Sequence, residues 1–503
     1  MRENVLSFEE HRNKRQRQDQ GRGKAREVKY KKSFDYSLIV LMAILLCFGL
    51  VMVFSSSYYT AEIRASSNHD ATYYFVKQLI CVVLGVALMI FFMYFDYHKF
   101  IRFVSKKGVT SRFSNLKIYR VLMVLAILSL LLVFVPGIGT EINGSRRWIN
   151  IGISIQPSEI VKFALIVFMG CSIGADPRKI KSFKSGVLPY VVILMVICVL
   201  LYVQPNFSAI MCIGALVICM LILGGARMSH IGVLVGAMAL AIVVLIAAEP
   251  YRLNRLLGYT GQESLWQVEQ ARLSIASGGV FGRGLGNSMQ KMLYLPMGES
   301  DYIFAIIVEE LGLVGGIAVI VLFALIIWRG ALAAVRAPDL TGMLIASGVV
   351  AMIAIQVFVN IGVATTLLPS TGVVLPFISY GGSSVLMFMA MIGLVLNISR
   401  QGNAAIPAAG GEADDLRRLY KNWAEERRKV QIRSAKREKL TSAEKSKSKH
   451  EKTVTVSSSE VKAVRKPRRG AGRALAQHGR SQEAANIVRE TNNKNQLIFR
   501  IVE

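Results

Sequence analysis

The sequence has few of the residues that build metal centres or disulfide frameworks. It contains six cysteines in 503 residues, and no two of them have the spacing of a zinc site. All six fall inside long apolar runs, where a disulfide is not expected. We interpret them as small packing residues: Cys47, Cys81, Cys171, Cys198, Cys212 and Cys219.

The central part of the chain lacks the polar stripes of a soluble amphipathic helix, and this excludes an ordinary soluble core. The mean hydropathy is +0.44. Apolar runs recur that are long enough to cross a hydrocarbon core of about 30 Å. We predict an all-α polytopic membrane protein, a bundle of ten transmembrane helices. The predicted spans are 36–57, 72–95, 119–136, 157–174, 187–203, 207–224, 229–248, 301–328, 342–365 and 377–398.

Acidic residues are scarce, with 32 against 60 basic ones, and the excess of positive charge lies at the two ends. Residues 1–35 hold 11 basic side chains, and the tail after the last span holds 25. Because ten spans place both termini on one side and basic segments stay inside, we expect both termini to be cytoplasmic. The basic ends are expected to attract anionic membrane lipids. No nucleic acid is expected, since no recognition motif accompanies the charge.

Three regions follow from this distribution of charge. Residues 1–35 form a basic segment predicted to be disordered, without a cleavable signal. Residues 36–398 form the membrane domain, and residues 399–503 a basic tail that is partly helical and then disordered. The stretch 249–300, between the seventh and eighth helices, is a long extracytoplasmic loop expected to fold back as short helices. Its GGVFGRGLGNS lacks the GK[ST] ending of a nucleotide-binding loop.

Three carboxylates occur where an apolar span should carry no charge. Asp301 opens the eighth span, where it could cap the helix or serve chemistry. Glu309 and Glu310 lie about 12–14 Å further in, where an unpaired charge costs at least about 2.5 kcal/mol. An ion pair inside the bundle is one interpretation of these two, with Lys162 as a candidate partner. Glu159 is a candidate partner for Arg146 or Arg147.

Several cations are expected on the outer side against the topological bias, among them Arg146, Arg147 and Arg283. Such cations suit a phosphate or pyrophosphate. A carboxylate close to them can act as a general base. The residues therefore favour a membrane site for an anionic, lipid-linked substrate without naming the reaction.

Five blocks of the chain resemble the SEDS family, which contains division, elongation and sporulation proteins. They are NGSRRWINIG…QPSEIVKFAL (143–165), QPNFS (204–208), GRGLGNSMQKMLYLP (282–296), SDYIFAIIVEELG (300–312) and LPSTGVVLPFISYGGSS (368–384). The resemblance spans roughly 36–400 in order. The chain differs from the common family motifs at three places. It has QPNFS where many relatives have QPDFG, SDYIF where TDFIF is commoner, and VEELG where GEELG is usual. The motif GNS-x-QK, which reads GNSMQK in this chain, favours a place in the division branch of the family.

The resemblance implies a peptidoglycan glycosyltransferase that polymerises lipid II at the outer face of the bacterial cytoplasmic membrane. Asp301 would be the catalytic base. Substrate-handling roles would fall on Arg146, Arg147, Gln156, Lys162 and Arg283, and cavity-shaping ones on Tyr380, Gly381 and Gly382. Glu159, Glu309 and Glu310 would be structural or cavity-lining charges.

The resemblance also implies partners and leaves alternatives open. A class B penicillin-binding protein would supply the transpeptidase, other division proteins would join it at the septum, and a divalent cation (Mg²⁺ or Mn²⁺) could assist the pyrophosphate. The alternatives are a lipid II flippase, an elongation polymerase of RodA type, and a scaffold that recruits division proteins through its tail.

Overall fold

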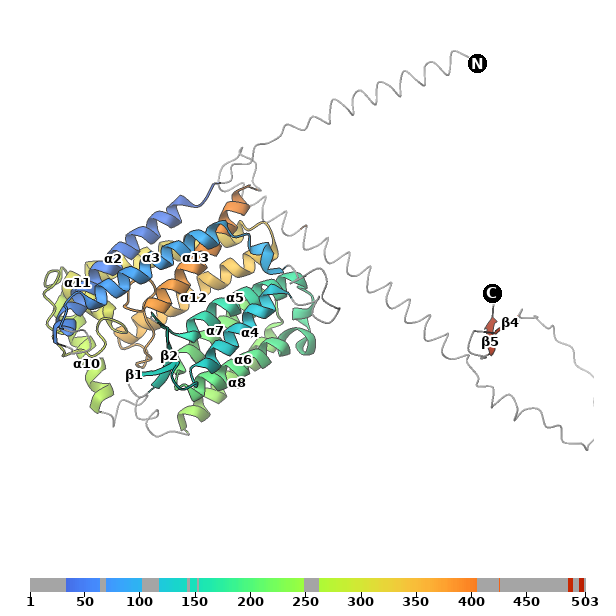
Figure 1. Cartoon of the computed structure of the whole chain (residues 1–503), viewed down its shortest axis with the longest axis horizontal. Helices are drawn as coiled ribbons and strands as arrows, with labels where there is room; N and C mark the ends of the chain where they lie inside the picture. The colour runs from blue at the N-terminus through green and yellow to red at the C-terminus, as the bar shows by residue number, and fades with distance from the viewer. Residues whose placement is uncertain are drawn as a thin grey trace, which may run out of the picture. The chain divides into compact units, whose positions relative to one another are not determined.

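A computed structural model describes most of the membrane domain and little of the tail. The described residues are 33–63, 69–101, 117–142, 145–151, 153–247, 262–404, 425, 487–491 and 497–501. The chain divides into two units, Met1–Gly411 and Glu412–Glu503. Within the described residues, the first unit is a helical bundle with one small sheet (Figure 1).

Apolar helices occupy each of the ten predicted positions. Seven are long and apolar enough to cross a membrane, and three are shorter apolar stretches: Ile118–Leu132, Phe207–Leu223 and, as part of a longer helix, Met228–Leu240. The first unit is therefore the membrane domain of a multi-pass membrane protein. That the chain crosses the membrane ten times stays a prediction. The helices are α2 (Tyr36–Ile63), α3 (Tyr73–Tyr94), α4 (Ile118–Leu132), α5 (Pro157–Ala175), α6 (Leu188–Val203, preceded by the π-turn Phe183–Val187), α7 (Phe207–Leu223), α8 (Met228–Ala247), α11 (Ile303–Val335), α12 (Leu340–Ala364) and α13 (Gly382–Ala404).

The largest departures from the predicted bounds occur at four helix ends, among them the end of α13, which lies at Ala404 and thus six residues beyond the predicted 398. Helices α2 and α11 each continue for several residues beyond the predicted end of the span. Helix α13 begins five residues later than the predicted 377, because Phe377 and Ile378 belong to a loop. Both side chains are almost fully buried in that loop, so their apolar character reflects burial in protein rather than contact with lipid.

Helices α5 and α12 lie at the centre of the packing. Helix α12 packs against α5, α7, α11 and α13, and α13 also packs along α3 (Figure 1). Helix α5 is largely buried on all sides, whereas α3 exposes most of its apolar side chains. This division is expected of a bundle whose outer helices face lipid and whose inner helices face only protein.

A three-stranded antiparallel sheet occupies part of the segment predicted to be a loop between the third and fourth spans. Its strands are β1 (Gly139–Ile142), β2 (Ser145–Ile151) and β3 (Ile153–Ile155), in the order β1-β2-β3. Ile149 pairs with both Gly139 and Ile155 across the sheet. The alternation in WINIGISI and the Asn143-Gly144 pair between β1 and β2 are β-hairpin signals. We therefore correct the prediction of a loop without strands.

Helix α10 (Gln262–Gly278) confirms that the 249–300 stretch contains helix. It packs along α11, with a smaller contact on α12. In the second unit the structure describes Glu425 and a hairpin of β4 (Ile487–Thr491) and β5 (Leu497–Ile501). The hairpin lies where disorder was predicted. The predicted disorder of residues 1–32 and the predicted helix of the tail lie outside the described residues, Glu425 excepted.

Candidate active site

Asp301 stands directly before helix α11 rather than at its cap. The N-cap is Tyr302, so the prediction that Asp301 could be the capping residue is wrong. The backbone N–H of Asp301 donates to the carbonyl of Met297 at 3.0 Å. Its own carbonyl accepts a hydrogen bond from Asn360 Nδ2 at 2.9 Å. The main chain of Asp301 is thus tied to α12, while its side chain stays partly exposed.

The loop between α12 and α13 wraps around the residues that precede α11. Ser379 Oγ donates to the carbonyl of Ser300 at 2.5 Å, and the Tyr380 N–H donates to the carbonyl of Glu299 at 2.9 Å. Asn360 Nδ2 also donates to the carbonyl of Val373 at 2.7 Å. Two segments far apart in the sequence are therefore joined beside Asp301, and a single buried amide, that of Asn360, holds both.

Gly372 faces the carboxylate of Asp301. A Cβ atom at this glycine would lie 3.2 Å from Asp301 Oδ2 and 4.0 Å from Ser208 Oγ, near the start of α7. Its φ of +72° is one that other residues rarely adopt. Glycine at 372 thus leaves room between the carboxylate and the beginning of α7, on the side of Asp301 that Ser208 borders.

Tyr380 lies in the same loop, with its ring edge-on to Tyr74 and the ring centroids 5.0 Å apart. Burial raises the pKa of Tyr380, so the hydroxyl stays protonated and acts as a hydrogen-bonding group rather than a base. The N–H of Gly381 donates to Gln78 Oε1 at 3.3 Å. A Cβ at Gly382 would lie 2.6 Å from Cys81 Sγ. The three residues fix the loop against α3.

The sheet brings two of the predicted cations to the start of α7 and the surface. Arg147 Nε donates to the carbonyl of Gln204 at 3.2 Å, and Arg147 Nη2 donates to the carbonyl of Pro205. Arg146 pairs with Glu141 at 3.2 Å, and its side chain is 58% exposed. Arg147 therefore fastens the sheet to the segment before α7, whereas Arg146 offers its guanidinium to solvent.

Gln156 joins the sheet to α13 at the start of α5. It is the N-cap of α5, and its backbone N–H donates to Ser383 Oγ at 3.0 Å. Ser383 Oγ donates in turn to the carbonyl of Ser154 at 2.8 Å. This places the beginning of α5 against the beginning of α13.

Lys162 and Glu159 form a buried ion pair with each other. Lys162 Nζ lies 2.5 Å from Glu159 Oε1, and each side chain is 5% exposed. Residues three apart share one face of a helix, so the pair forms locally within α5. The predicted pairings of Lys162 with Glu309 or Glu310, and of Glu159 with Arg146 or Arg147, are therefore wrong.

Glu309 is fully buried and accepts hydrogen bonds from α10 and from the segment after it. Its Oε2 accepts from Ser274 Oγ at 2.9 Å and from Ser288 Oγ at 2.7 Å. Its Oε1 accepts from the Met289 N–H at 2.9 Å. Arg283 lies 3.7 Å away, with 42% of its side chain exposed. The carboxylate is thus satisfied mainly by neutral donors, and Arg283 keeps part of its guanidinium in solvent.

Glu310 forms the second buried ion pair, with Lys291. Lys291 Nζ lies 2.8 Å from Glu310 Oε1, and both side chains are fully buried. Ser55 Oγ of α2 donates to Glu310 Oε2 at 2.6 Å. The ammonium also donates to the carbonyl of Gly286 at 2.6 Å and lies 4.8 Å from the centroid of the Tyr58 ring. An internal ion pair that locks the bundle was the right interpretation of Glu310, but with another lysine.

Helix α11 is interrupted beside these carboxylates. Gly312 has φ +72° and ψ −174°, so the helical hydrogen bonds break there. The freed groups bond to the glycine-rich segment: the Gly284 N–H donates to the carbonyl of Glu310 at 2.9 Å, and the Leu313 N–H donates to the carbonyl of Gly279 at 3.0 Å. A Cβ at Gly282 would lie 2.2 Å from the Glu310 carbonyl oxygen. These glycines allow the segment to turn tightly against the backbone of α11.

Comparisons with known proteins identify the family. Residues 36–404 match the family described as cell cycle protein, whose members are FtsW, RodA and SpoVE. The chain belongs to this family. The match covers the helical bundle of the first unit and leaves out the N-terminal segment and the tail.

Relatives of the FtsW/RodA/SpoVE family align over nearly their whole length. Stage V sporulation protein E of Bacillus subtilis is 39% identical over 378 residues, which are 74% of this chain and 98% of the relative. The probable peptidoglycan glycosyltransferase FtsW of Geobacter metallireducens is 36% identical over 373 residues, covering 73% and 94%. The corresponding FtsW of Bacillus subtilis is 36% identical over 388 residues, covering 74% and 92%.

Solved structures share the arrangement of the bundle. A chain from work on the structural coordination of polymerization and crosslinking by a peptidoglycan synthase complex superposes with a TM-score of 0.58 at 26% identity. It covers 73% of this chain and 98% of its own. The rod shape determining protein RodA of Thermus thermophilus gives a TM-score of 0.52 at 25% identity, covering 73% and 97%.

Sequence reasoning missed three residues that organise the FtsW/RodA/SpoVE site. They are Asn360, Gly372 and Lys291, of which Asn360 and Lys291 are at most 2% exposed. Asn360 is a polar residue inside an apolar span, and that was a usable signal. The glycine in STGVV was a weaker signal, and Lys291 had none beyond its positive charge in the long loop.

Proposed function

We propose that this protein is a peptidoglycan glycosyltransferase that polymerises lipid II. Membership of the family and the names of the relatives support the reaction class. The observation that carries the proposal is the contrast among the carboxylates around α11. Glu309 and Glu310 are fully buried, whereas Asp301 is partly exposed and its main chain is fixed from two sides.

Asp301 would act as the general base. Its carboxylate would take the proton from the 4-hydroxyl of the acceptor's N-acetylglucosamine. That oxygen attacks C1 of the donor's N-acetylmuramic acid, and undecaprenyl pyrophosphate leaves with the electron pair of the broken bond. Because an α-linked donor gives a β-linked product, the reaction inverts configuration. It needs no second, nucleophilic carboxylate of the kind a retaining glycosidase uses.

The leaving pyrophosphate would be stabilised by arginines with exposed guanidinium groups. Arg283 and Arg146 are 42% and 58% exposed, and both lie on segments that flank the bundle. Arginine suits a pyrophosphate because its planar fork donates two parallel hydrogen bonds. Arg147, Gln156 and Lys162 would act indirectly, since their contacts fasten the sheet and α5 around the site.

A divalent cation fits less well as a resident group. Among the described residues, no three His, Cys, Asp or Glu side chains are grouped as a metal site. Mg²⁺ often binds through one or two carboxylates together with substrate phosphates. An assisting Mg²⁺ or Mn²⁺ would therefore arrive with the pyrophosphate, and none of the steps above is assigned to it.

A flippase would need the intramembrane charges to line a path for the head group. In this structure Glu309 and Glu310 are occupied by Ser274, Ser288, Lys291 and Ser55. Lys162 is occupied by Glu159. These contacts give the charges an architectural role, and they favour the polymerase over the flippase.

The proposal includes a partner and a location. A class B penicillin-binding protein would crosslink what this chain polymerises, because one structural match belongs to a peptidoglycan synthase complex that coordinates polymerization with crosslinking. Both termini would be cytoplasmic and the site extracytoplasmic. A role at the division septum is favoured because many relatives are named FtsW. The elongation role of RodA and the sporulation role of SpoVE are the alternatives within the family.

The deciding experiment supplies labelled lipid II to the purified protein, with and without its penicillin-binding partner. The wild type is expected to make glycan chains and Asp301→Asn none. Ser300→Ala is a matched control, because it alters the neighbouring side chain and keeps the carboxylate. Chains of equal length from Asp301→Asn would refute the assignment of the base.

A further inference from the structure

The segment that follows α10 exposes apolar side chains beside the break in α11. Within residues 280–285, Val280 is 56% exposed, Phe281 83% and Leu285 54%. Apolar side chains gathered on a surface in this way mark a contact with protein or with membrane. The position of the segment relative to the membrane-spanning helices decides between the two.

Backbone hydrogen bonds join this segment to α11 just after the break. The Leu313 N–H donates to the carbonyl of Gly279 at 3.0 Å, and the Val314 N–H donates to the carbonyl of Val280 at 3.2 Å. Leu313, Val314 and Ile317 are themselves at least 50% exposed. In an apolar helix that spans a membrane, such side chains face lipid. The exposed surface of residues 280–285 therefore adjoins a lipid-facing surface of α11.

Helices α2 and α11 pack against each other, and two contacts between them measure depth in the membrane (Figure 1). At one end Asp35 Oδ1 pairs with Arg329 Nη2 at 2.8 Å. At the other end Ser55 Oγ donates to Glu310 Oε2 at 2.6 Å. Ser55 lies twenty residues after Asp35, and a helix of that length rises about 30 Å. The two contacts are thus separated by the thickness of a hydrocarbon core, about 30 Å.

The Asp35–Arg329 contact stands at one edge of that core. Tyr36 and Trp328 flank it in the sequence and are 66% and 59% exposed. Exposed tyrosine and tryptophan side chains gather where membrane meets water, and an ion pair is costly deep in the hydrocarbon. The contact between α2 and α11 at the far end therefore marks the opposite edge, on the side of Asp301.

The apolar segment lies on the hydrocarbon side of this second edge. Val314 follows Glu310 by four residues in the direction of Arg329, which is about 5–6 Å along the helix axis. Val280 is bonded to Val314 and so lies at the same depth. Segments that lie in a membrane interface bury their apolar face about 5–10 Å into the boundary between headgroups and acyl chains.

The backbone of the segment also meets the requirement that lipid imposes. Irregular backbone is tolerated at membrane depth only where protein satisfies its polar groups. The Arg283 N–H donates to the carbonyl of Glu309 at 3.0 Å, and the Gly284 N–H donates to the carbonyl of Glu310 at 2.9 Å. The break at Gly312 frees these carbonyls from the helical pattern. The broken helix and the segment thus satisfy each other.

We propose that residues 280–285 form a re-entrant segment, which dips into the membrane leaflet on the Asp301 side and leaves it again. Val280 and Phe281 contact acyl chains, while the partly exposed guanidinium of Arg283 reaches the phosphates of the headgroups. The long loop is thereby anchored in lipid at the point where α11 breaks. The re-entrant segment is a property of how the chain sits in the membrane, and it holds whether or not the protein polymerises lipid II.

Spin labels on the full-length protein in lipid nanodiscs, with one chain per disc, test the insertion. Phe281→Cys supplies the labelling site, and its large exposure means that the change removes little packing. Power saturation compares how often the label collides with oxygen, which concentrates in hydrocarbon, and with a nickel chelate, which stays in water. Alanine replaces the native cysteines that are not buried: Cys47, Cys198 and Cys219.

Two reference labels calibrate the measurement in the same background. Ile320→Cys reports lipid on α11, where the residue is 43% exposed. Glu141→Cys reports water, because that side chain is 52% exposed in the sheet. The label at Phe281→Cys is expected to collide with oxygen about threefold or more as often as with the chelate, since polar molecules are excluded from hydrocarbon. A second reporter, Val280→Cys, should give the same ratio.

Two results would overturn the re-entrant segment. A ratio at Phe281→Cys and Val280→Cys that matches the one at Glu141→Cys would show that the segment lies in water. Few collisions with either reagent would show that another part of the chain covers it. A ratio that matches the one at Ile320→Cys supports the insertion.

Discussion

The two carboxylate regions around the start of α11 differ in what surrounds them. Glu309 and Glu310 lie inside the helix, fully buried, and each is satisfied by hydroxyl, amide or ammonium donors. Asp301 lies just outside the helix, partly exposed, beside a glycine that leaves room next to its oxygen. Acidity alone therefore does not mark a catalytic residue in this bundle. The informative property is how far the carboxylate is exposed, which separates Asp301 from the two fully buried glutamates.

The largest expected effect comes from Asp301→Asn, which keeps the shape of the side chain and removes the base. We expect polymerisation to fall about 10²- to 10⁴-fold, the range that general base catalysis contributes. The melting temperature should stay near that of the wild type, because the Asn360 contact involves only the main chain of residue 301. Chain formation from lipid II and thermal unfolding are measured on the same preparation. A normal rate of polymerisation in Asp301→Asn would show that the difference in exposure between Asp301 and the two glutamates does not mark a catalytic base.

Glu310→Ala should act on stability instead. It leaves the ammonium of Lys291 buried and unpaired, at a cost of about 3–5 kcal/mol. Denaturation in detergent would show the loss, and the remaining folded protein should keep its rate per molecule. The double variant Glu310→Leu with Lys291→Met should recover part of the stability, because no charge is then left alone. Full stability in Glu310→Ala would contradict the ion pair.

Asn360→Leu tests whether the position of Asp301 matters. This change removes the donor that joins the carbonyls of Asp301 and Val373. A misplaced catalytic group can cost about 10²-fold in rate, so we expect kcat to fall by that order with KM for lipid II little changed. Asn360→Gln should restore part of the rate if its longer amide reaches the same carbonyls. A rise in KM alone would show that Asn360 serves binding rather than the placement of Asp301.

The smallest change in stability is expected from Arg146→Gln. Its ion pair with Glu141 is exposed on both sides, and such pairs contribute about 0–1 kcal/mol. The melting temperature should therefore hardly move. If Arg146 binds the pyrophosphate, KM for lipid II should rise, and more so at low salt, where charge attraction is less screened. Glu141→Gln removes the same ion pair, keeps the arginine and serves as the control.

Much of the fold could be predicted from hydrophobicity, because a lipid-facing or protein-buried helix needs a long apolar run. The helices stand at all ten predicted positions, and α2, α4, α11 and α13 have an end displaced by four residues or more. The sheet was missed although alternating isoleucines signalled it. Phe377 and Ile378 were assigned to a span because hydrophobicity does not distinguish a buried loop from a membrane helix.

The candidate site was predictable only in part. The assignment of Asp301 rests on the family motif, and its catalytic role stays a prediction. The partners of Glu309 and Glu310 could not be deduced, because Ser288 and Lys291 lie 21 and 19 residues earlier in the chain, in a loop. Such pairing depends on tertiary contacts, whereas the Glu159–Lys162 pair follows the local spacing of a helix.

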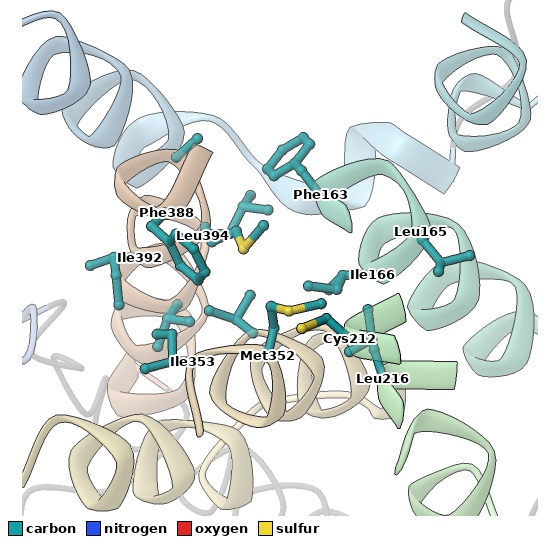
Figure 2. Close-up of a cluster of buried hydrophobic side chains, with 14 of the residues drawn as sticks. Phe163, Leu165, Ile166, Cys212, Leu216, Met352, Ile353, Phe388, Ile392 and Leu394 are labelled. Carbon is teal, nitrogen blue, oxygen red and sulfur yellow. The ribbon is translucent and has the colours of Figure 1, made fainter. Parts of the chain in front are cut away.

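Figure 2 shows Met352 and Leu216 among buried apolar side chains of neighbouring helices, and this apolar packing has a bioenergetic consequence. A bacterium that assembles its wall at this protein must also hold an electrochemical gradient across the same membrane. An aqueous opening beside Asp301 would short-circuit that gradient if it continued through the bundle. Because buried apolar side chains fill the space between α5, α7 and α12, the bundle can hold charged groups near Asp301 without conducting ions across the membrane.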